Sequence, residues 1–265
     1  MIPAVGDLVL AFACESLPDP DAVRLGIAPD GSDDALRRRV VSVAMVRRTA
    51  AKDGTPDLAL LAIPKPEGAF APLPERKIVG SFLAGIGQRR PQLIGYGSHG
   101  GDLLLLARRA IVLGIPARGF FQAAPGRSGQ PEYLSSGADC SPDLAERFAD
   151  RPFAPGEPVP PLRDVAAACG IPELSEAFPV PASADGEGAL AACTARACCR
   201  ALTVYLLWLR MAAVAGHFDA IGYAEEQELL RQHLMHLSEN PAYPFAEPFL
   251  EAWDALTTAA ESIGR

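Results

Sequence analysis

The chain has few of the features that mark secreted, membrane or zinc-finger proteins. Its 265 residues include six cysteines, and no two of them form a C-x-x-C pair. A chain of this length can bury a large core without disulfides, so we expect free thiols in a reducing, cytoplasmic compartment. The N-terminus has no basic stretch followed by a long apolar one, and we find no apolar run of transmembrane length. The sequence therefore predicts no membrane partner.

An excess of positive charge is also lacking. The net charge of −8 argues against non-specific binding of nucleic acid through bulk electrostatics. The charge is uneven, however, because residues 1–130 carry 16 Lys/Arg and 12 Asp/Glu, whereas residues 131–265 carry 8 and 20. The arginines of the first half form either a solvated surface or a local contact with nucleic acid.

The order of predicted elements is that of an α/β domain followed by helices. Three strands separated by turns predict an antiparallel meander, and a fourth strand is expected to run parallel to the first. The strands are expected over residues 7–16, 39–46, 58–63 and 91–96, and the helices over 74–88, 102–113, 141–148, 161–169, 187–216, 224–237 and 247–263. We expect a mixed sheet flanked by helices in residues 1–216, with residues 217–265 as a helical extension packed on it or appended to it.

The first strand ends in a carboxylate. Because side chains alternate along a strand, Ala13 and Glu15 are expected to face one side of the sheet and Cys14 the other. A carboxylate at the end of a buried strand is costly to desolvate unless a partner neutralises it. Glu15 therefore either reaches water or points into a cleft at the sheet edge, where α/β folds place their sites.

A second carboxylate follows the fourth strand. The run Gly97-Ser98-His99-Gly100-Gly101 predicts a tight turn, and Asp102 begins the next helix. A strand, a glycine turn and an acidic helix start form a corner that places Asp102 at the same cleft.

Several segments resemble one protein family. Residues 12–19 (FACESLPD) resemble the opening motif of the predicted 3′–5′ exonucleases related to the proofreading domain of family B DNA polymerases. Similar segments follow in the same order at 91–103, 143–144, 162–172 and 205–210. The resemblance implies a ribonuclease H-like fold and a DEDD-type site, in which carboxylates hold two divalent metal ions that hydrolyse a phosphodiester.

The same resemblance shows that functional positions have been replaced. The first aspartate of the family falls on Ala13, the aspartate of the third motif on Arg200, and its Tyr or His on Arg196. Only Glu15 and Asp102 remain. We therefore expect these two carboxylates to bind Mg²⁺ or Mn²⁺ weakly or not at all.

The two arginines lead to a structural hypothesis. Arg196 and Arg200 are four residues apart, so they share one face of a largely apolar helix. Buried arginines need acidic partners. We predict that Arg200 pairs with Asp102, Glu15 or both and occupies the region of the lost metals. The alternative is that both arginines extend to the surface.

Three functions remain open at this point. The first is an exonuclease-like protein with an impaired site that retains contact with single-stranded DNA, another nucleic acid or a protein. His99 and Ser98 are then candidates for contact with nucleic acid. The second is an active, divergent exonuclease in which Asp7, Asp19, Asp143 or Asp185 replaces the lost ligands. The third is an interaction scaffold without a nucleic-acid role.

Overall fold

The protein is built on one four-stranded mixed sheet. The computed structural model describes residues 3–22, 24, 26–27, 36–50, 56–66, 73–123, 131–153, 158–180 and 187–262. The strands β1 (Leu8–Pro18), β2 (Arg38–Ala50), β3 (Pro56–Ile63) and β4 (Gln92–Ile94) lie in the order β3-β2-β1-β4. β1 pairs antiparallel with β2 and parallel with β4, and β2 pairs antiparallel with β3. The predicted meander with one added parallel strand is confirmed.

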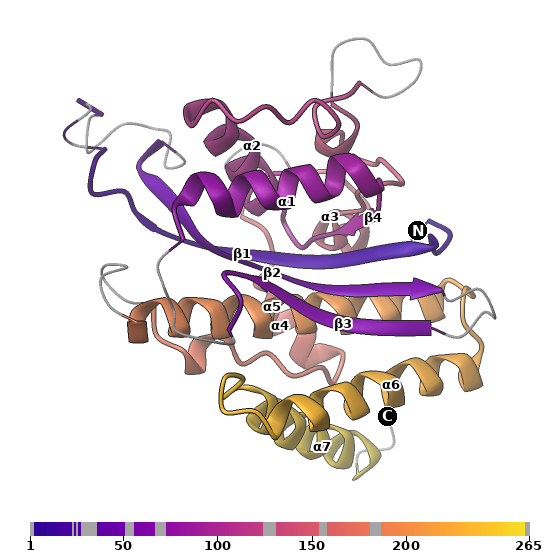
Figure 1. Ribbon diagram of the computed structural model, residues 1–265. Helices are drawn as coiled ribbons and strands as arrows, with labels where there is room; N and C mark the ends of the chain where they lie inside the picture. The colour runs from indigo at the N-terminus through magenta and orange to yellow at the C-terminus, as the bar shows by residue number, and fades with distance from the viewer. Residues whose placement is uncertain are drawn as a thin grey trace.

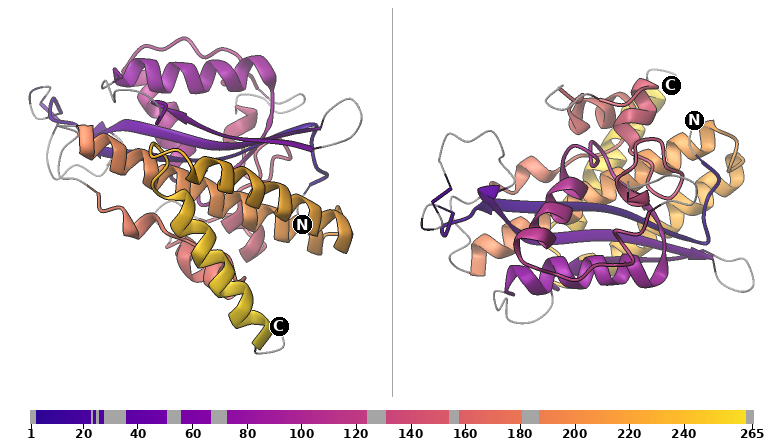
Figure 2. Two further views of the ribbon diagram at one scale, coloured as in Figure 1. Left: turned by 60° about the horizontal axis from the view of Figure 1, so that its bottom comes forward. Right: turned by 90° about the horizontal axis from the view of Figure 1, so that it is seen from above.

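Helices cover both faces of this sheet. Figure 1 shows α1 and α2 on one side and α5, α6 and α7 on the other, and the two views in Figure 2 show the same layers. The bounds are α1 (Glu75–Arg89), α2 (Asp102–Val112), α3 (Leu144–Ala149), α4 (Leu162–Ala168), α5 (Glu187–Val214), α6 (Ala220–Ser238) and α7 (Ala246–Ser262), with two short 3₁₀ turns at Glu132–Leu134 and Ser175–Ala177.

β1 is buried between the two helical layers. Its odd-numbered residues, including Ala13, pack in a cluster with α5, while its even-numbered residues, including Cys14, pack with α1 and α2. The alternation predicted from the sequence is therefore confirmed. It places Glu15 on the α5 side of the sheet, since Glu15 lies two residues after Ala13.

β4 is shorter than predicted. The strand pairs with β1 only from Gln92 to Ile94, and a segment further along the chain then lies beside it. The Leu93 N–H donates to the Cys140 carbonyl at 2.7 Å, and the Leu144 N–H donates to the Gly95 carbonyl at 2.8 Å. These bonds bring the start of α3 next to the glycine turn that follows β4.

The expectation that no run reaches transmembrane length is wrong for α5. Residues Gly188–Val214 are long and apolar enough to cross a membrane by length and composition. However, 72% of the most apolar part of this helix is buried inside the protein. Packing against β1 and β2 accounts for its apolar character, because a helix that is apolar on most sides must be covered.

The C-terminal helices pack on the same core as α5. Leu230, Leu234, Phe249 and Trp253 belong to the apolar cluster that includes the α5 face of β1. A buried ion pair adds to this packing, since Glu226 Oε1 accepts hydrogen bonds from Arg48 of β2 at 2.8 and 2.5 Å.

Two further groups complete this contact between α6 and the sheet. The Tyr205 hydroxyl of α5 donates to Glu226 Oε2 at 3.0 Å. His233 Nε2 accepts the backbone N–H of Leu60 on β3 at 3.1 Å, and burial lowers the pKa of this histidine. The division of the chain at residue 216 stays a prediction, as does the last residue of the final predicted helix, Ile263, which lies outside the described residues.

Glu226→Ala is predicted to destabilise the fold strongly. The change leaves Arg48 buried without its acidic partner, and breaking a buried pair in this way costs about 3–5 kcal/mol. Urea denaturation of the variant measures this loss. Glu225→Ala changes the exposed neighbouring glutamate and should shift the free energy of unfolding by less than about 0.5 kcal/mol. Equal effects of the two changes would contradict a structural role for the pair.

Candidate functional site

The site lies where β1 continues beyond the end of β4. The ladder between these strands ends at the pair Ala11 and Ile94. The backbone of Cys14 is bonded to side chains from two helices: its N–H donates to Asp102 Oδ2 at 3.1 Å, and its carbonyl accepts from Arg200 Nη1 at 2.9 Å. Asp102 and Arg200 thus satisfy strand groups that β4 no longer reaches.

Arg200 bridges the two retained carboxylates. Its Nη1 donates to Glu15 Oε1 at 3.0 Å, and its Nη2 donates to Asp102 Oδ2 at 3.2 Å. The Glu15 side chain is 9% exposed and the Arg200 side chain 25%. The predicted pairing is present, and it involves both carboxylates. Glu15 is therefore neutralised by a partner, and the alternative that Arg200 extends away to the surface is wrong.

Arg196 forms a second cationic contact with Glu15. Its Nε lies 3.3 Å from Glu15 Oε1, and its Nη1 donates to the carbonyl of Ser175 at 2.8 Å. The short 3₁₀ turn at Ser175–Ala177 thus anchors the outer end of this guanidinium. Ala13 is buried on the same face of β1 and offers only a methyl group to this site.

Burial and charge act in opposite directions on these groups. Burial raises the pKa of Glu15, while Arg200 and then Arg196 act to lower it. The negative charge of Asp102 raises the pKa of Arg200 and outweighs the opposing effect of burial. Burial also raises the pKa of the Cys14 thiol well above its usual value, so this cysteine is a packing residue rather than a nucleophile.

These residues do not fit a pair of divalent metal ions. A two-metal site needs a cluster of oxygen ligands around two cations about 4 Å apart. Here two carboxylates converge on the guanidinium of Arg200, and Glu15 is further neutralised by Arg196. A divalent ion between Glu15 and Asp102 would have to displace the cation that already holds them together.

The carboxylates that could replace the lost metal ligands are either bonded to other residues, far from the site, or outside the described residues. Asp19 Oδ2 accepts from Arg109 Nη2 at 2.9 Å, within a buried network that includes Glu75 at the start of α1. Asp7 precedes β1 by one residue, so it lies about 26 Å along the strand from Glu15 at a rise of 3.3 Å per residue. Asp185 lies outside the described residues.

Asp143, the last of these candidates, holds the glycine turn in place. Its Oδ1 accepts the N–H groups of Gly97 at 2.8 Å and Ala145 at 3.0 Å. Its Oδ2 accepts from the His99 N–H at 3.0 Å and from the Ser98 hydroxyl at 3.3 Å. Asp143 is the N-cap of α3 and clamps the turn that carries Asp102.

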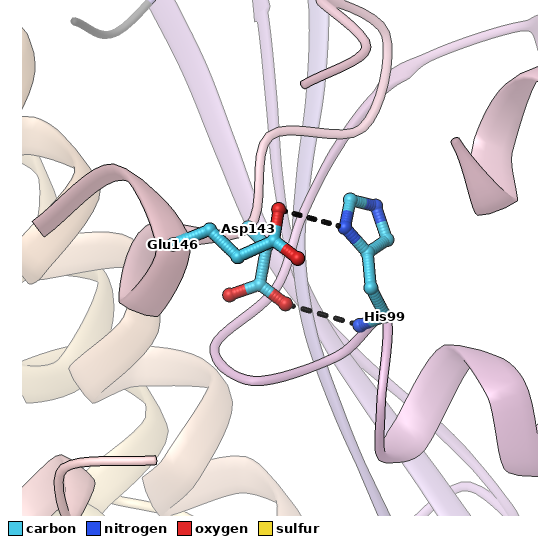
Figure 3. A group of neighbouring side chains, drawn as sticks. All are labelled: His99, Asp143 and Glu146. Carbon is cyan, nitrogen blue, oxygen red and sulfur yellow. Dashed lines mark hydrogen bonds and ion pairs between the residues drawn. The ribbon is translucent and has the colours of Figure 1, made fainter. Parts of the chain in front are cut away.

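His99 pairs with a second acidic residue of α3. Its Nδ1 lies 3.2 Å from Glu146 Oε2, and Figure 3 shows the ring facing this carboxylate while the backbone N–H of His99 faces Asp143. One ligand atom from each of these three residues lies within 4.8 Å of the others. A metal ion is nevertheless a poor fit, because the four bonds to Asp143 use the acceptor capacity of its carboxylate.

The contacts of His99 and Ser98 with nucleic acid stay a prediction, and both side chains are largely covered in the structure. The His99 side chain is 8% exposed, and Ser98 is 3% exposed. Both are bonded to α3, so neither is presented to a ligand. The sequence reasoning missed Glu146, although Asp143 followed three residues later by Glu146 is a recognisable helix-start pattern.

Most of the chain matches one protein family. Residues 34–253 match the family of predicted 3′–5′ exonucleases related to the exonuclease domain of PolB. The chain belongs to this family. No curated protein matches it.

Several solved structures are similar to this chain, and one of them is a DNA polymerase. It is the family B DNA polymerase from the hyperthermophilic archaeon Pyrobaculum calidifontis, with 23% sequence identity and a TM-score of 0.42. The similarity covers 92% of this chain and 27% of the polymerase, so the chain spans about a quarter of that protein.

Arg200→Met is predicted to make stability depend on pH. Removing the guanidinium leaves the buried Glu15 beside the half-buried Asp102 with no cation between them and costs about 3 kcal/mol near pH 7. Burial raises the pKa of the Glu15 carboxyl in the folded state. Lowering the pH protonates this carboxyl and thereby increases the free energy of unfolding. The variant should therefore recover stability between about pH 7 and pH 5, while the wild-type protein recovers little.

Urea denaturation across this pH range measures the effect. The Glu15→Gln/Arg200→Met double variant is the matched control, because it lacks the titrating carboxyl and should show a flat profile over the same interval. An identical pH response of the single and double variants would contradict the assignment to Glu15.

Proposed function

We propose that this member of the family does not hydrolyse nucleic acid and acts as a pseudoenzyme. The supporting observation is the Arg200 guanidinium between Glu15 and Asp102, at distances of 3.0 and 3.2 Å. An internal cation thereby takes the place of the divalent ions that the family uses. With Ala13 in place of an acidic ligand, the described site lacks the carboxylates to activate water and stabilise a leaving oxygen.

We further propose that the fold is retained for binding single-stranded nucleic acid through its exposed cations. Family membership and the excess of Lys/Arg over Asp/Glu in residues 1–130 support this part. The exposed positions Arg76, Lys77 and Arg89 lie on α1, whereas Arg90 at its C-cap is paired with Glu132. Phosphate contacts of this kind need no metal and depend on charge alone.

The hollow beside the site is not well suited to phosphate. It has a volume of about 300 Å³ and is lined in part by Arg163, Arg200, Glu173 and Glu176. Arg163 pairs with Glu176 at 2.9 Å, and Arg200 is already bridged to Glu15 and Asp102. The lining therefore offers no excess of positive charge, which favours binding on α1 over binding in the hollow.

A metal titration tests the loss of catalysis. Calorimetry of the wild-type protein with MnCl₂ should show no saturable binding. The Ala13→Asp/Arg200→Asp variant restores two acidic ligands and should bind Mn²⁺. An assay on single-stranded DNA with a free 3′ end should show no digestion by the wild-type protein with Mg²⁺ or Mn²⁺. Robust digestion that Glu15→Ala abolishes would show that the protein is an active, divergent exonuclease.

A salt titration tests the binding part of the proposal. Fluorescence anisotropy with a labelled single-stranded oligonucleotide should show binding that weakens as salt increases. About three phosphate contacts would give a slope near −2 in a plot of log K against log salt. Reversing the charge of Arg76 and Lys77 together should reduce this slope. Absence of binding at low ionic strength would favour an interaction scaffold without a nucleic-acid role.

A further inference from the structure

A groove of about 600 Å³ runs along the β3 edge of the sheet, mainly on the face opposite Glu15. Leu10 and Met45 line it, and both belong to the apolar cluster that packs with α1. Glu15 faces α5, on the other side of β1. The groove is therefore separate from the candidate site, and neither Arg200 nor Asp102 lines it.

The groove exists because one part of this face has no helix over it. β3 makes its main helix contacts with α5 and α6, which lie on the opposite face. On the groove side, α1 presents the small residues Ser81, Ala84 and Gly85, which leave space beside the helix. Leu61 of β3 is 39% exposed there. This volume falls within the range of about 300–1,000 Å³ that ligand pockets have.

The charge of the lining selects the ligand. Arg47, Lys65 and Arg89 line the groove, and no Asp or Glu is among the described lining residues. Arg47 also pairs with Asp57 at 3.0 Å, so Lys65 and Arg89 are the cations without an acidic partner in the described ion pairs. The chain as a whole has a net charge of −8. The charged groups of the described groove lining are all basic, so this surface has the opposite sign of charge from the protein as a whole.

We propose that this groove binds an acidic amphipathic segment of a protein partner. The apolar side chains of the bound segment contact the groove around Leu61. The carboxylates of the segment pair with Lys65 and Arg89, as in helix-in-groove recognition. Single-stranded nucleic acid fits less well, because it needs exposed rings for base stacking. The aromatic residues of the lining, Phe82 and Tyr243, are both buried.

A peptide selection tests the proposal on the full chain. A phage-displayed library of random 16-residue peptides is selected against the wild-type protein, and the enriched peptides are synthesised and titrated. We expect them to combine Asp and Glu with apolar residues at helical spacing. Arg89→Glu removes a basic contact, and Ala84→Trp fills the space beside α1 with a large side chain. Each change should weaken peptide binding about tenfold.

Arg118→Glu is the matched control. It makes the same charge change at an exposed position outside the groove and should leave peptide affinity unchanged. Thermal melting checks that each variant is folded. The proposal is overturned if no enriched peptide depends on both Arg89 and Ala84, or if the enriched peptides are basic.

A second readout separates this groove from the proposed binding of nucleic acid. The same variants are titrated with the labelled single-stranded oligonucleotide, and Ala84→Trp should not change its affinity. If Ala84→Trp abolishes oligonucleotide binding instead, the groove is a nucleic-acid site and the peptide proposal fails. Neither result depends on whether the Glu15 site binds metal.

Discussion

The interaction on which the site depends is the bridge from Arg200 to Glu15 and Asp102. It joins β1, the start of α2 and the middle of α5, three elements that are distant in sequence. The same guanidinium also donates to the Cys14 carbonyl and completes the backbone hydrogen bonds of β1 where β4 has ended. In a two-metal nuclease, cations hold the corresponding carboxylates together. Here the guanidinium of Arg200 lies between the two carboxylates and bonds to both.

Two other buried ion pairs also join separate elements of the fold. Arg109 of α2 binds Glu75 of α1, and Arg48 of β2 binds Glu226 of α6. Each pair links a helix to a neighbouring element and has further hydrogen-bond partners, which buried charges require. The two faces of the sheet nevertheless differ in character. The α5 face carries the neutralised site, whereas the α1 face carries exposed cations and an apolar groove.

Much of this arrangement could be predicted because it depends on local patterns. The alternation of β1 predicted the face of Glu15, the glycine turn predicted the position of Asp102, and the spacing of Arg196 and Arg200 on one helix face led to the predicted pairing of Arg200 with these carboxylates. The features that the sequence analysis did not predict depend on contacts between segments that are distant in sequence. Glu146 lies 47 residues from His99, so no local pattern shows that it would bury that side chain. The anchoring of Arg196 on the Ser175 carbonyl and the network from Asp19 to Arg109 were missed for the same reason.

The central claim is that the carboxylate pair holds an arginine and not divalent ions. A crystal structure of the wild-type protein soaked in MnCl₂, with an anomalous difference map, tests it most directly. The account predicts the Arg200 guanidinium in density between Glu15 and Asp102, with no anomalous peak beside either carboxylate. Two manganese peaks about 4 Å apart among these side chains, with Arg200 displaced, would contradict it.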